Sequence, residues 1–371
     1  MVHRIGVIGG GQLARMMIPA AVNLGLDLRV LAENEGESAE LAVEALGDFR
    51  DVETVLRFAR DVDVVTFDHE HVPQDVLRAL VAAGVAVRPG PGALLYAQDK
   101  LLMREKLAEL GLPVPDWARV ASAADLDAFL ADHGGSAVLK TPTGGYDGKG
   151  VRVVRSSAEA ADWFGSGDLL VEELVSFNRE LAQLVARRPS GQVVAWPLVE
   201  SVQRDGVCAE VIAPAPGSAG RVADMAMDIA TTVADQLDVT GVLAVELFET
   251  TDDRLLINEL AMRPHNTGHW TIDGSMTSQF EQHLRAVLDL PLGSAEAREP
   301  WSVMVNVLGG PISGTLVDRY PLLMASQPRV KVHNYGKAPR PGRKVGHVTA
   351  VGADLDEVVF EARAAAAFFE G

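Results

Sequence analysis

Short apolar runs alternate with amphipathic stretches through the first third of the chain. Apolar runs at residues 4–8, 26–32 and 62–67 predict strands, and stretches at 52–60, 73–83 and 94–110 predict helices. Strands and helices that alternate in this way predict a parallel sheet covered on both faces, and hence an α/β fold. Gly111, Pro113 and Pro115 stop the last of these helices, so we place a domain boundary after residue 112.

Beyond residue 112 the pattern changes, because several strands follow one another with few helices between them. The predicted strands lie at 136–140, 151–154, 168–175, 180–187, 193–198, 241–248 and 255–261. The predicted helices lie at 123–133, 218–237, 278–288 and 354–369. The strands at 180–187 and 193–198 flank Pro189-Ser190-Gly191, which predicts an antiparallel pair.

Composition excludes several classes of function. The chain has 371 residues and a formal net charge of −18, which argues against nucleic-acid partners and anionic membrane surfaces. No apolar run is long enough to span a bilayer, and the N-terminal residues lack a signal-peptide pattern. Cys208 is the single cysteine, which excludes an intrachain disulfide, and we interpret it as structural.

A glycine motif follows the first predicted strand. Gly9, Gly11 and Ala14 fit the G-x-G-x-x-A form of the dinucleotide fingerprint, and Glu33 ends the next strand, where it could bind a ribose hydroxyl. The alternative is a tight strand-to-helix turn whose amides face another anion. The segment FDHEHVP (67–73) also lies at a strand end, but its histidines and glutamate lack metal-ligand spacing.

A glycine loop lies between the predicted strands at 136–140 and 151–154. Its sequence, TPTGGYDGKG, follows Lys140, but the spacing differs from a Walker P-loop and the loop leads into a strand instead of a helix. We therefore interpret it as a hairpin whose glycine amides and lysine close over phosphates. A merely flexible surface loop is the alternative.

Acids and a lysine suggest where a nucleotide would lie. Glu172 and Glu173, followed by Glu180, belong to strands whose edges could bind a purine ring and a ribose, although solvated edge charges are the alternative. Lys100, near the start of the helix at 94–110, could face a phosphate or simply be solvated.

Two glutamates face each other in a predicted hairpin. If Asp252 and Asp253 form its tip, Glu246 lies directly opposite Glu259. Opposed like charges destabilise a sheet unless a cation lies between them. Because carboxylates and the amide of Asn258 are hard oxygen ligands, the hairpin predicts a Mg²⁺ site shared with substrate phosphates. An exposed hairpin with solvated acids is the alternative.

A basic stretch near the C-terminal end stands out in this acidic chain. Lys337, Arg340, Arg343, Lys344 and His347 lie among glycines and prolines, which predict a loop. Arginine pairs with phosphate through two parallel hydrogen bonds, so this loop predicts a site for a phosphate-bearing substrate. A solvated basic loop is the alternative.

Five stretches carry a resemblance to a known family. They are GGGQLARM, TGGYDGKG, INELAMRPHNTGHWT, SQFEQHLRA and YGKAPRPGRKVGH. Over nearly its whole length the chain resembles the ATP-grasp superfamily and, within it, the N5-carboxyaminoimidazole ribonucleotide synthetase family. The glycine loop is typical of ATP-grasp proteins in general, whereas RPHNTGHWT and RPGRKVGH are similar to this synthetase family in particular.

The resemblance implies a fold and a reaction. The fold would have three domains: a Rossmann-like domain at 1–112, a lid domain at 113–185 and a larger α+β domain at 186–371. ATP would phosphorylate bicarbonate to carboxyphosphate, and the 5-amino group of aminoimidazole ribonucleotide would take up the carboxyl group, in purine biosynthesis. The cofactors would be ATP and Mg²⁺, with Mn²⁺ as an alternative ion. The resemblance further implies a cytoplasmic homodimer without nucleic-acid or membrane partners.

Site residues follow from the matching motifs. Those implied to bind ATP are Lys100, Lys140, Gly145, Tyr146, Asp147, Gly148, Lys149, Gly150, Val151, Glu172, Glu173, Leu174, Val175, Glu180, Gln203, Asn258 and Glu259. Glu246 and Glu259 would ligate the metal, and the catalytic end would hold Tyr146, Asp147, Arg263, His265 and Asn266. Lys337, Arg340, Arg343 and Lys344 would include the ligands of the ribonucleotide phosphate. Lys100, Gln203, Met262 and Thr267 depart from the commoner arginine, histidine, proline and serine of relatives, which affects individual contacts and not the reaction.

Three other functions remain open at this point. A dinucleotide-dependent oxidoreductase would explain the first glycine motif alone. A non-catalytic nucleotide sensor would explain the glycine loop without a second substrate. A sister ATP-grasp ligase acting with formate or another acyl acceptor is the nearest enzymatic alternative.

Overall fold

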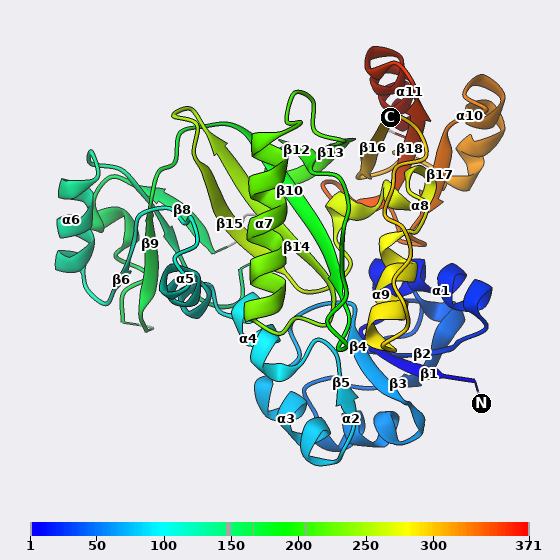
Figure 1. Ribbon diagram of the computed structural model, residues 1–371, viewed down its shortest axis with the longest axis horizontal. Coiled ribbons are helices and arrows are strands. Elements are labelled where there is room, and N and C mark those ends of the chain that lie inside the picture. Colours follow the sequence, from blue (N-terminus) through cyan, green and yellow to red (C-terminus); the bar gives the residue numbers. More distant parts are fainter. Residues whose placement is uncertain (1, 146–149, 166, 205, 370–371) are drawn as a thin grey trace.

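A computed structural model describes residues 2–145, 150–165, 167–204 and 206–369 of the chain. The described residues form a five-stranded, a four-stranded and a nine-stranded sheet. In Figure 1 the four-stranded sheet lies to the left of the large central sheet, and the five-stranded sheet lies below it. No helix of the described part is long and apolar enough to cross a membrane.

The five-stranded sheet is parallel, as the alternating pattern predicts. Its order is β3-β2-β1-β4-β5. The elements are β1 (Arg4–Ile8), α1 (Gln12–Leu24), β2 (Asp27–Ala32), β3 (Val43–Leu46), α2 (Val52–Phe58), β4 (Val64–Phe67), α3 (Gln74–Ala82), β5 (Ala86–Val87), α4 (Pro91–Gln98) and α5 (Lys100–Glu109). Ile5 and Val7 pack with α1 on one face, while Val65 and Phe67 pack with α2 and α3 on the other, so both faces are buried.

The four-stranded sheet is antiparallel and has the order β6-β9-β7-β8. Its elements are β6 (Trp117–Val120), α6 (Ala123–Asp132), β7 (Ala137–Lys140), β8 (Val151–Val154) and β9 (Leu169–Glu173). β7 and β8 are the two arms of the glycine loop, so the loop joins two strands as predicted and does not lead into a helix.

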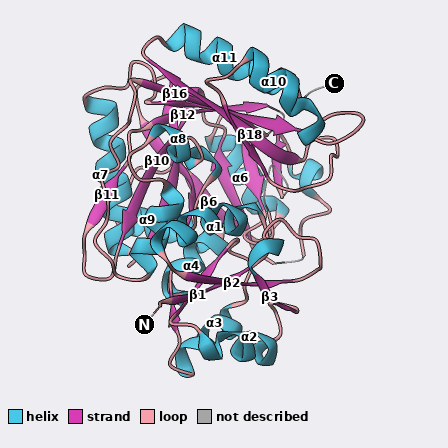
Figure 2. Ribbon diagram, turned by 90° about the vertical axis from the view of Figure 1, so that its right-hand side faces the viewer, coloured by secondary structure: helices cyan, strands magenta, loops and turns pink. Residues whose placement is uncertain are grey.

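The nine-stranded sheet is antiparallel and follows the order β15-β14-β10-β12-β13-β16-β18-β17, with β11 beside β10. Its strands are β10 (Phe177–Arg187), β11 (Val193–Ala195), β12 (Val199–Arg204), β13 (Val207–Ala213), β14 (Gly241–Thr250), β15 (Leu255–Ala261), β16 (Trp301–Leu308), β17 (Lys331–Asn334) and β18 (Lys344–Gly352). The helices of this part are α7 (Arg221–Gln236), α8 (Thr271–Gly274), α9 (Gln279–Val287), α10 (Tyr320–Ser326) and α11 (Leu355–Ala367). α7 contacts β10, β14 and β15, α9 lies between α1 and the same sheet, and α11 covers β16 and β18 (Figure 2).

The predicted hairpin of the two glutamates is confirmed. β14 and β15 pair in antiparallel register, and Glu246 is the direct partner of Glu259. Asp253, in the turn between the strands, adopts a φ of 63°, a left-handed conformation that aspartate tolerates better than most residues. A register shift between Glu246 and Leu247 brings the two acids opposite each other, because Leu247 pairs with Ile257 on the turn side of the shift.

Two expectations about secondary structure were wrong. The single helix expected at 94–110 is two helices, because Asp99 has extended backbone angles and its carboxylate accepts the N–H groups of Leu101 and Leu102 at 2.9 and 3.0 Å, which caps α5. The basic stretch is a loop only as far as Arg343, because Lys344 and His347 lie on β18.

Candidate active site

A cavity of about 1300 Å³ opens between the three sheets. It brings together most of the predicted site residues. These are Lys100, Lys140, Gly145, Val151, Glu172, Glu173, Leu174, Val175, Glu180, Gln203, Glu246, Asn258, Glu259, Arg263, His265, Asn266, Lys337, Arg340, Arg343 and Lys344. Gly150 is absent from the described lining. Its carbonyl accepts the backbone N–H of Thr141 at 2.9 Å and closes the β7–β8 hairpin. Tyr146, Asp147, Gly148 and Lys149 lie outside the described residues.

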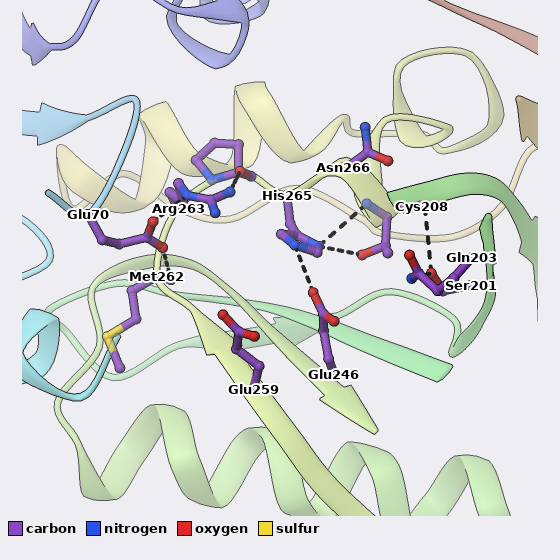
Figure 3. Close-up of polar contacts among 12 residues, drawn as sticks. Glu70, Ser201, Gln203, Cys208, Glu246, Glu259, Met262, Arg263, His265 and Asn266 are labelled. Carbon is purple, nitrogen blue, oxygen red and sulfur yellow. Dashed lines mark hydrogen bonds and ion pairs between the residues drawn. The ribbon is translucent and has the colours of Figure 1, made fainter. Parts of the chain in front are cut away.

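The paired glutamates each face a cationic or protonatable side chain. Glu246 Oε1 lies 3.0 Å from His265 Nε2, and Glu259 Oε1 lies 3.5 Å from Lys100 Nζ. Both carboxylates point toward the loop that carries Arg263 and His265 (Figure 3). Burial alone would raise the pKa of Glu246, but the hydrogen bond from His265 and nearby cations outweigh it and lower that pKa. The charged form of Glu246 is therefore favoured.

The donor set around these glutamates fits a shared Mg²⁺ ion. Glu246 and Glu259 supply carboxylate oxygens, and Asn258 supplies an amide oxygen beside them on β15. Within the described part of the chain, no group of three or more His, Cys, Asp or Glu side chains could hold a metal. Mg²⁺ commonly binds through one or two carboxylates, water and substrate phosphates. The chemistry thus suits an ion that arrives with a nucleotide.

Lys140 is held in place by a buried carboxylate. Its Nζ lies 2.6 Å from Glu172 Oε2 and 3.4 Å from Asn258 Oδ1. Burial alone would raise the pKa of Glu172, but Lys140 and Arg104 outweigh it and lower that pKa. The carboxylate of Glu172 therefore anchors this lysine, so any contact from Glu172 to a nucleoside would compete with that role.

The loop after β15 is anchored by a glutamate from the five-stranded sheet. Glu70 Oε2 accepts a hydrogen bond from Arg263 Nε at 2.5 Å, and Glu70 Oε1 accepts one from the backbone N–H of Met262 at 3.0 Å (Figure 3). His265 Nδ1 lies 2.8 Å from Thr267 Oγ1, which leaves its Nε2 facing Glu246. Arg263 is thus fixed by a residue far away in the sequence, whereas His265 is fixed by Thr267 and by Glu246 of the neighbouring hairpin.

Glu180 lines the same cavity close to Glu246. Burial and the nearby charge of Glu246 raise the pKa of Glu180 to about 7. Phe177 and Phe248 stack beside it with ring centroids 4.7 Å apart and line the same cavity. The edge therefore combines apolar rings with an acid, a combination suited to a nucleoside.

The basic segment, residues 337–344, forms another part of the cavity wall. Lys337 Nζ donates to Gln12 Oε1 at 2.7 Å, and Arg343 Nη1 donates to the carbonyl of Ala338 at 3.3 Å. His347 is not part of this wall, because its ring is fully buried and its Nδ1 lies 2.8 Å from the hydroxyl of Tyr335. The prediction that placed His347 with the cations of this basic loop was therefore wrong.

The first glycine motif has a different use from the dinucleotide fingerprint. Asp68, at the end of β4, accepts the backbone N–H of Ala14 at 2.8 Å, so a carboxylate occupies the N-terminus of α1. A Cβ on Gly11 would lie 2.0 Å from Asp68 Oδ2, which explains the glycine there. Glu33 forms an exposed ion pair with Arg50 at 3.0 Å. These contacts argue against a bound pyrophosphate at this turn.

Several residues that shape the site were missed. Arg104 and Asp68 were not singled out, and Glu70 was considered only as a metal ligand. A charged residue on the apolar face of a helix is the signal that could have revealed Arg104, because Leu101, Met103 and Leu107 around it are buried. Cys208 is buried and free, and burial raises the pKa of its thiol to about 11, in keeping with a structural role.

Comparisons with known proteins agree with this architecture. Three family models match the chain: a ribonucleotide synthetase preATP-grasp domain at 2–98, an ATP-grasp domain at 105–280 and a phosphoribosylaminoimidazole carboxylase C-terminal domain at 302–360. The N5-carboxyaminoimidazole ribonucleotide synthase of Mycobacterium tuberculosis is 51% identical over 98% of this chain and 86% of its own length. That of Corynebacterium ammoniagenes is 49% identical over 98% of this chain and 91% of its own length.

Solved structures agree as well. The synthetase from Thermus thermophilus superposes with a TM-score of 0.89 at 37% identity, covering 99% of each chain. The synthase from Aspergillus clavatus, in complex with ADP and 5-aminoimidazole ribonucleotide, gives 0.89 at 31% identity over 99% of this chain and 98% of the other. The resemblance of fold and family is therefore confirmed, and the chain belongs to the N5-carboxyaminoimidazole ribonucleotide synthase family of ATP-grasp enzymes.

Proposed function

We propose that this chain uses ATP and bicarbonate to carboxylate the 5-amino group of aminoimidazole ribonucleotide, releasing N5-carboxyaminoimidazole ribonucleotide, ADP and phosphate. The observation that carries the proposal is a single cavity that joins the acid hairpin, the anchored Lys140 and the basic segment. The names of its relatives, and the relative in complex with ADP and aminoimidazole ribonucleotide, support the same reaction.

The nucleotide would lie between the four-stranded sheet and β15. Lys100 and Lys140 would neutralise its phosphates, while the segment from Glu173 to Val175, at the end of β9, would face the purine ring and Glu180 the ribose. Glu246 and Glu259 would hold Mg²⁺, or Mn²⁺ in its place, which when bound supplies charge neutralisation at the phosphates. Phosphoryl transfer depends mainly on such positioning and neutralisation, so no nucleophilic side chain is needed.

The second half of the reaction would take place beside Arg263, His265 and Asn266, together with Tyr146 and Asp147. Because Glu70 fixes the Arg263 guanidinium, its remaining donors can orient bicarbonate and the acyl group derived from it. His265 Nε2 already interacts with Glu246, so this ring would stabilise negative charge between the metal ligands and the carboxyl group. Lys337, Arg340, Arg343 and Lys344 would bind the ribonucleotide phosphate.

An ADP-release assay tests the proposal directly. Release should require ATP, bicarbonate and aminoimidazole ribonucleotide together, and omission of either second substrate should lower it to background. Release supported by formate in place of bicarbonate would favour the sister ligase instead. Binding of ATP with no sustained release would favour a nucleotide sensor.

We also propose a three-domain division and a homodimer in the cytoplasm. The expected boundary at 185 would cut β10, which belongs wholly to the nine-stranded sheet, so sheet membership favours a boundary before Phe177. Sedimentation of the purified chain tests the dimer, and a single monomeric species would contradict it.

A further inference from the structure

Two cations on α5 face the same part of the molecule. Lys100 and Arg104 are four residues apart and therefore share one face of the helix. Lys100 reaches the cavity, where its Nζ lies 3.3 Å from the carbonyl oxygen of Gly145 and 3.5 Å from Glu259 Oε1. Arg104 is fully buried and is not among the described residues that line the cavity.

Arg104 covers the open edge of the strand that carries Asn258 and Glu259. β15 is the last strand of the large sheet, so one edge of it has no strand partner among the described strands. Arg104 Nη1 donates to the carbonyl of Ile257 at 2.7 Å, and Nη2 donates to the carbonyl of Asn258 at 3.0 Å. The backbone N–H of Ile257 donates to the carbonyl of Pro113 at 2.8 Å. At this edge of β15 the N–H of Ile257 and the carbonyls of Ile257 and Asn258 therefore all have hydrogen-bond partners.

The same guanidinium also holds the carboxylate that anchors Lys140. Arg104 Nε donates to Glu172 Oε1 at 2.7 Å, while the other carboxylate oxygen of Glu172 lies 2.6 Å from Lys140 Nζ. Lys140 Nζ in turn lies 3.4 Å from Asn258 Oδ1, whose own backbone carbonyl is bound by Arg104. These contacts close a ring of four residues drawn from α5, β9, β7 and β15.

We infer that Arg104 is a positioning residue for the nucleotide phosphates. Its planar fork reaches one carboxylate and two successive carbonyl groups at once, which fixes Lys140 relative to Asn258 and Glu259. The inference rests on the proposed function, because it takes Lys140 and Glu259 to be the groups that meet the phosphates and their metal. A buried arginine that only stabilised the fold would leave ATP affinity unchanged in a folded variant.

The R104K variant separates these two roles. A lysine keeps the positive charge opposite Glu172 but cannot bind all three acceptors, so Lys140 and β15 lose their common support. We expect the Kd for Mg-ATP, measured by titration calorimetry without turnover, to rise about tenfold, and kcat to fall about tenfold, while the KM for the ribonucleotide changes less than about twofold.

R119K is the matched control. Arg119 on β6 also joins α5 to the four-stranded sheet, through Glu105 at 2.5 Å and Asp168 at 2.6 Å, but this pair is exposed and lies outside the described lining of the cavity. R119K should bind Mg-ATP like the parent chain. Parental Mg-ATP affinity in folded R104K would overturn the inference.

If R104K does not fold, R104Q keeps a side-chain amide as donor without a buried charge and is measured in the same way. Parental Mg-ATP affinity in folded R104Q would likewise overturn the inference.

A parent chain that binds Mg-ATP but fails the ADP-release assay would overturn the proposed reaction. The comparison of Mg-ATP affinities would then still decide the role of Arg104, because it needs no second substrate.

Discussion

The cations at the β15 end of the cavity are buried among acceptors, whereas those of the basic segment, apart from Lys344 on β18, lie on a largely exposed loop. Lys140 is 8% exposed and Arg104 is fully buried, and both are bonded to Glu172. Arg340 is exposed, and Lys337 and Arg343 are partly exposed and donate hydrogen bonds to the neutral oxygens of Gln12 and Ala338. A change in the first region leaves buried groups without partners, while a change in the second mainly removes charge in a solvated setting. Substitutions should therefore alter geometry and turnover at one end and substrate affinity at the other.

The largest effect is expected at the acid hairpin. Glu259→Gln should lower turnover by at least about a hundredfold, because an amide cannot replace a charged metal ligand beside the phosphates. The melting temperature should stay nearly unchanged, since the residue is partly exposed and removing it relieves repulsion from Glu246. Asp252→Asn at the exposed hairpin tip is the control and should be as active as the parent chain. ATP hydrolysis at the parental rate in the Glu259→Gln variant would defeat the metal assignment.

Substitutions in the basic segment should weaken ribonucleotide binding and leave the chemical step nearly unchanged. Lys337→Ala should raise the KM for the ribonucleotide about tenfold and leave the KM for ATP within about twofold, because a phosphate contact is lost without a change in the hairpin. Lys331→Ala, an exposed lysine on β17 outside the described lining of the cavity, should have no effect. Equal losses for both substrates would place the basic segment at the nucleotide instead.

The smallest effect concerns the pH dependence of stability. The pKa of Glu180 is raised from 4.5 to about 7 in the folded chain. The folded state therefore keeps a proton that the unfolded state releases, and this contribution to stability is present at low pH and is lost as the pH rises from 4.5 through about 7. Glu180→Gln should raise the melting temperature by about 1–2 °C at pH 8 and by less at pH 5. A difference that does not vary with pH would show that Glu180 carries no raised pKa.

The two regions also differ in what their sequences reveal. The hairpin of β14 and β15 could be predicted from residues close together in the chain, because two apolar runs flank a short polar turn. The direct facing of Glu246 and Glu259 also depends on the β-bulge between Glu246 and Leu247, which the sequence pattern does not predict. The partners of the same site are distant: Glu172 is 68 residues from Arg104, and Glu70 is 193 residues from Arg263. Pairs of this kind depend on how three sheets meet, which local pattern does not specify.

The two wrong expectations about secondary structure, the single helix at 94–110 and the basic loop that extends past Arg343, have local causes. A helical pattern continues across Asp99, but the carboxylate of that residue caps a new helix and ends the previous one. Glycines and prolines before Lys344 predict a loop, yet residues 345–350 form a continuous buried run of β18, which carries His347 into the core. Lys337, Arg340, Arg343 and Lys344 line the cavity, while their binding of the ribonucleotide phosphate stays a prediction.

Metal placement at the hairpin is the most direct test of the account. A crystal grown with Mn²⁺ and a non-hydrolysable ATP analogue allows the ion to be located by its anomalous scattering. The account predicts one or more peaks at about 2.0–2.3 Å from carboxylate oxygens of both Glu246 and Glu259, with the remaining ligands supplied by phosphate and water. A nucleotide bound in the cavity with its metal away from both glutamates, and with Glu246 still bonded to His265 alone, would contradict it.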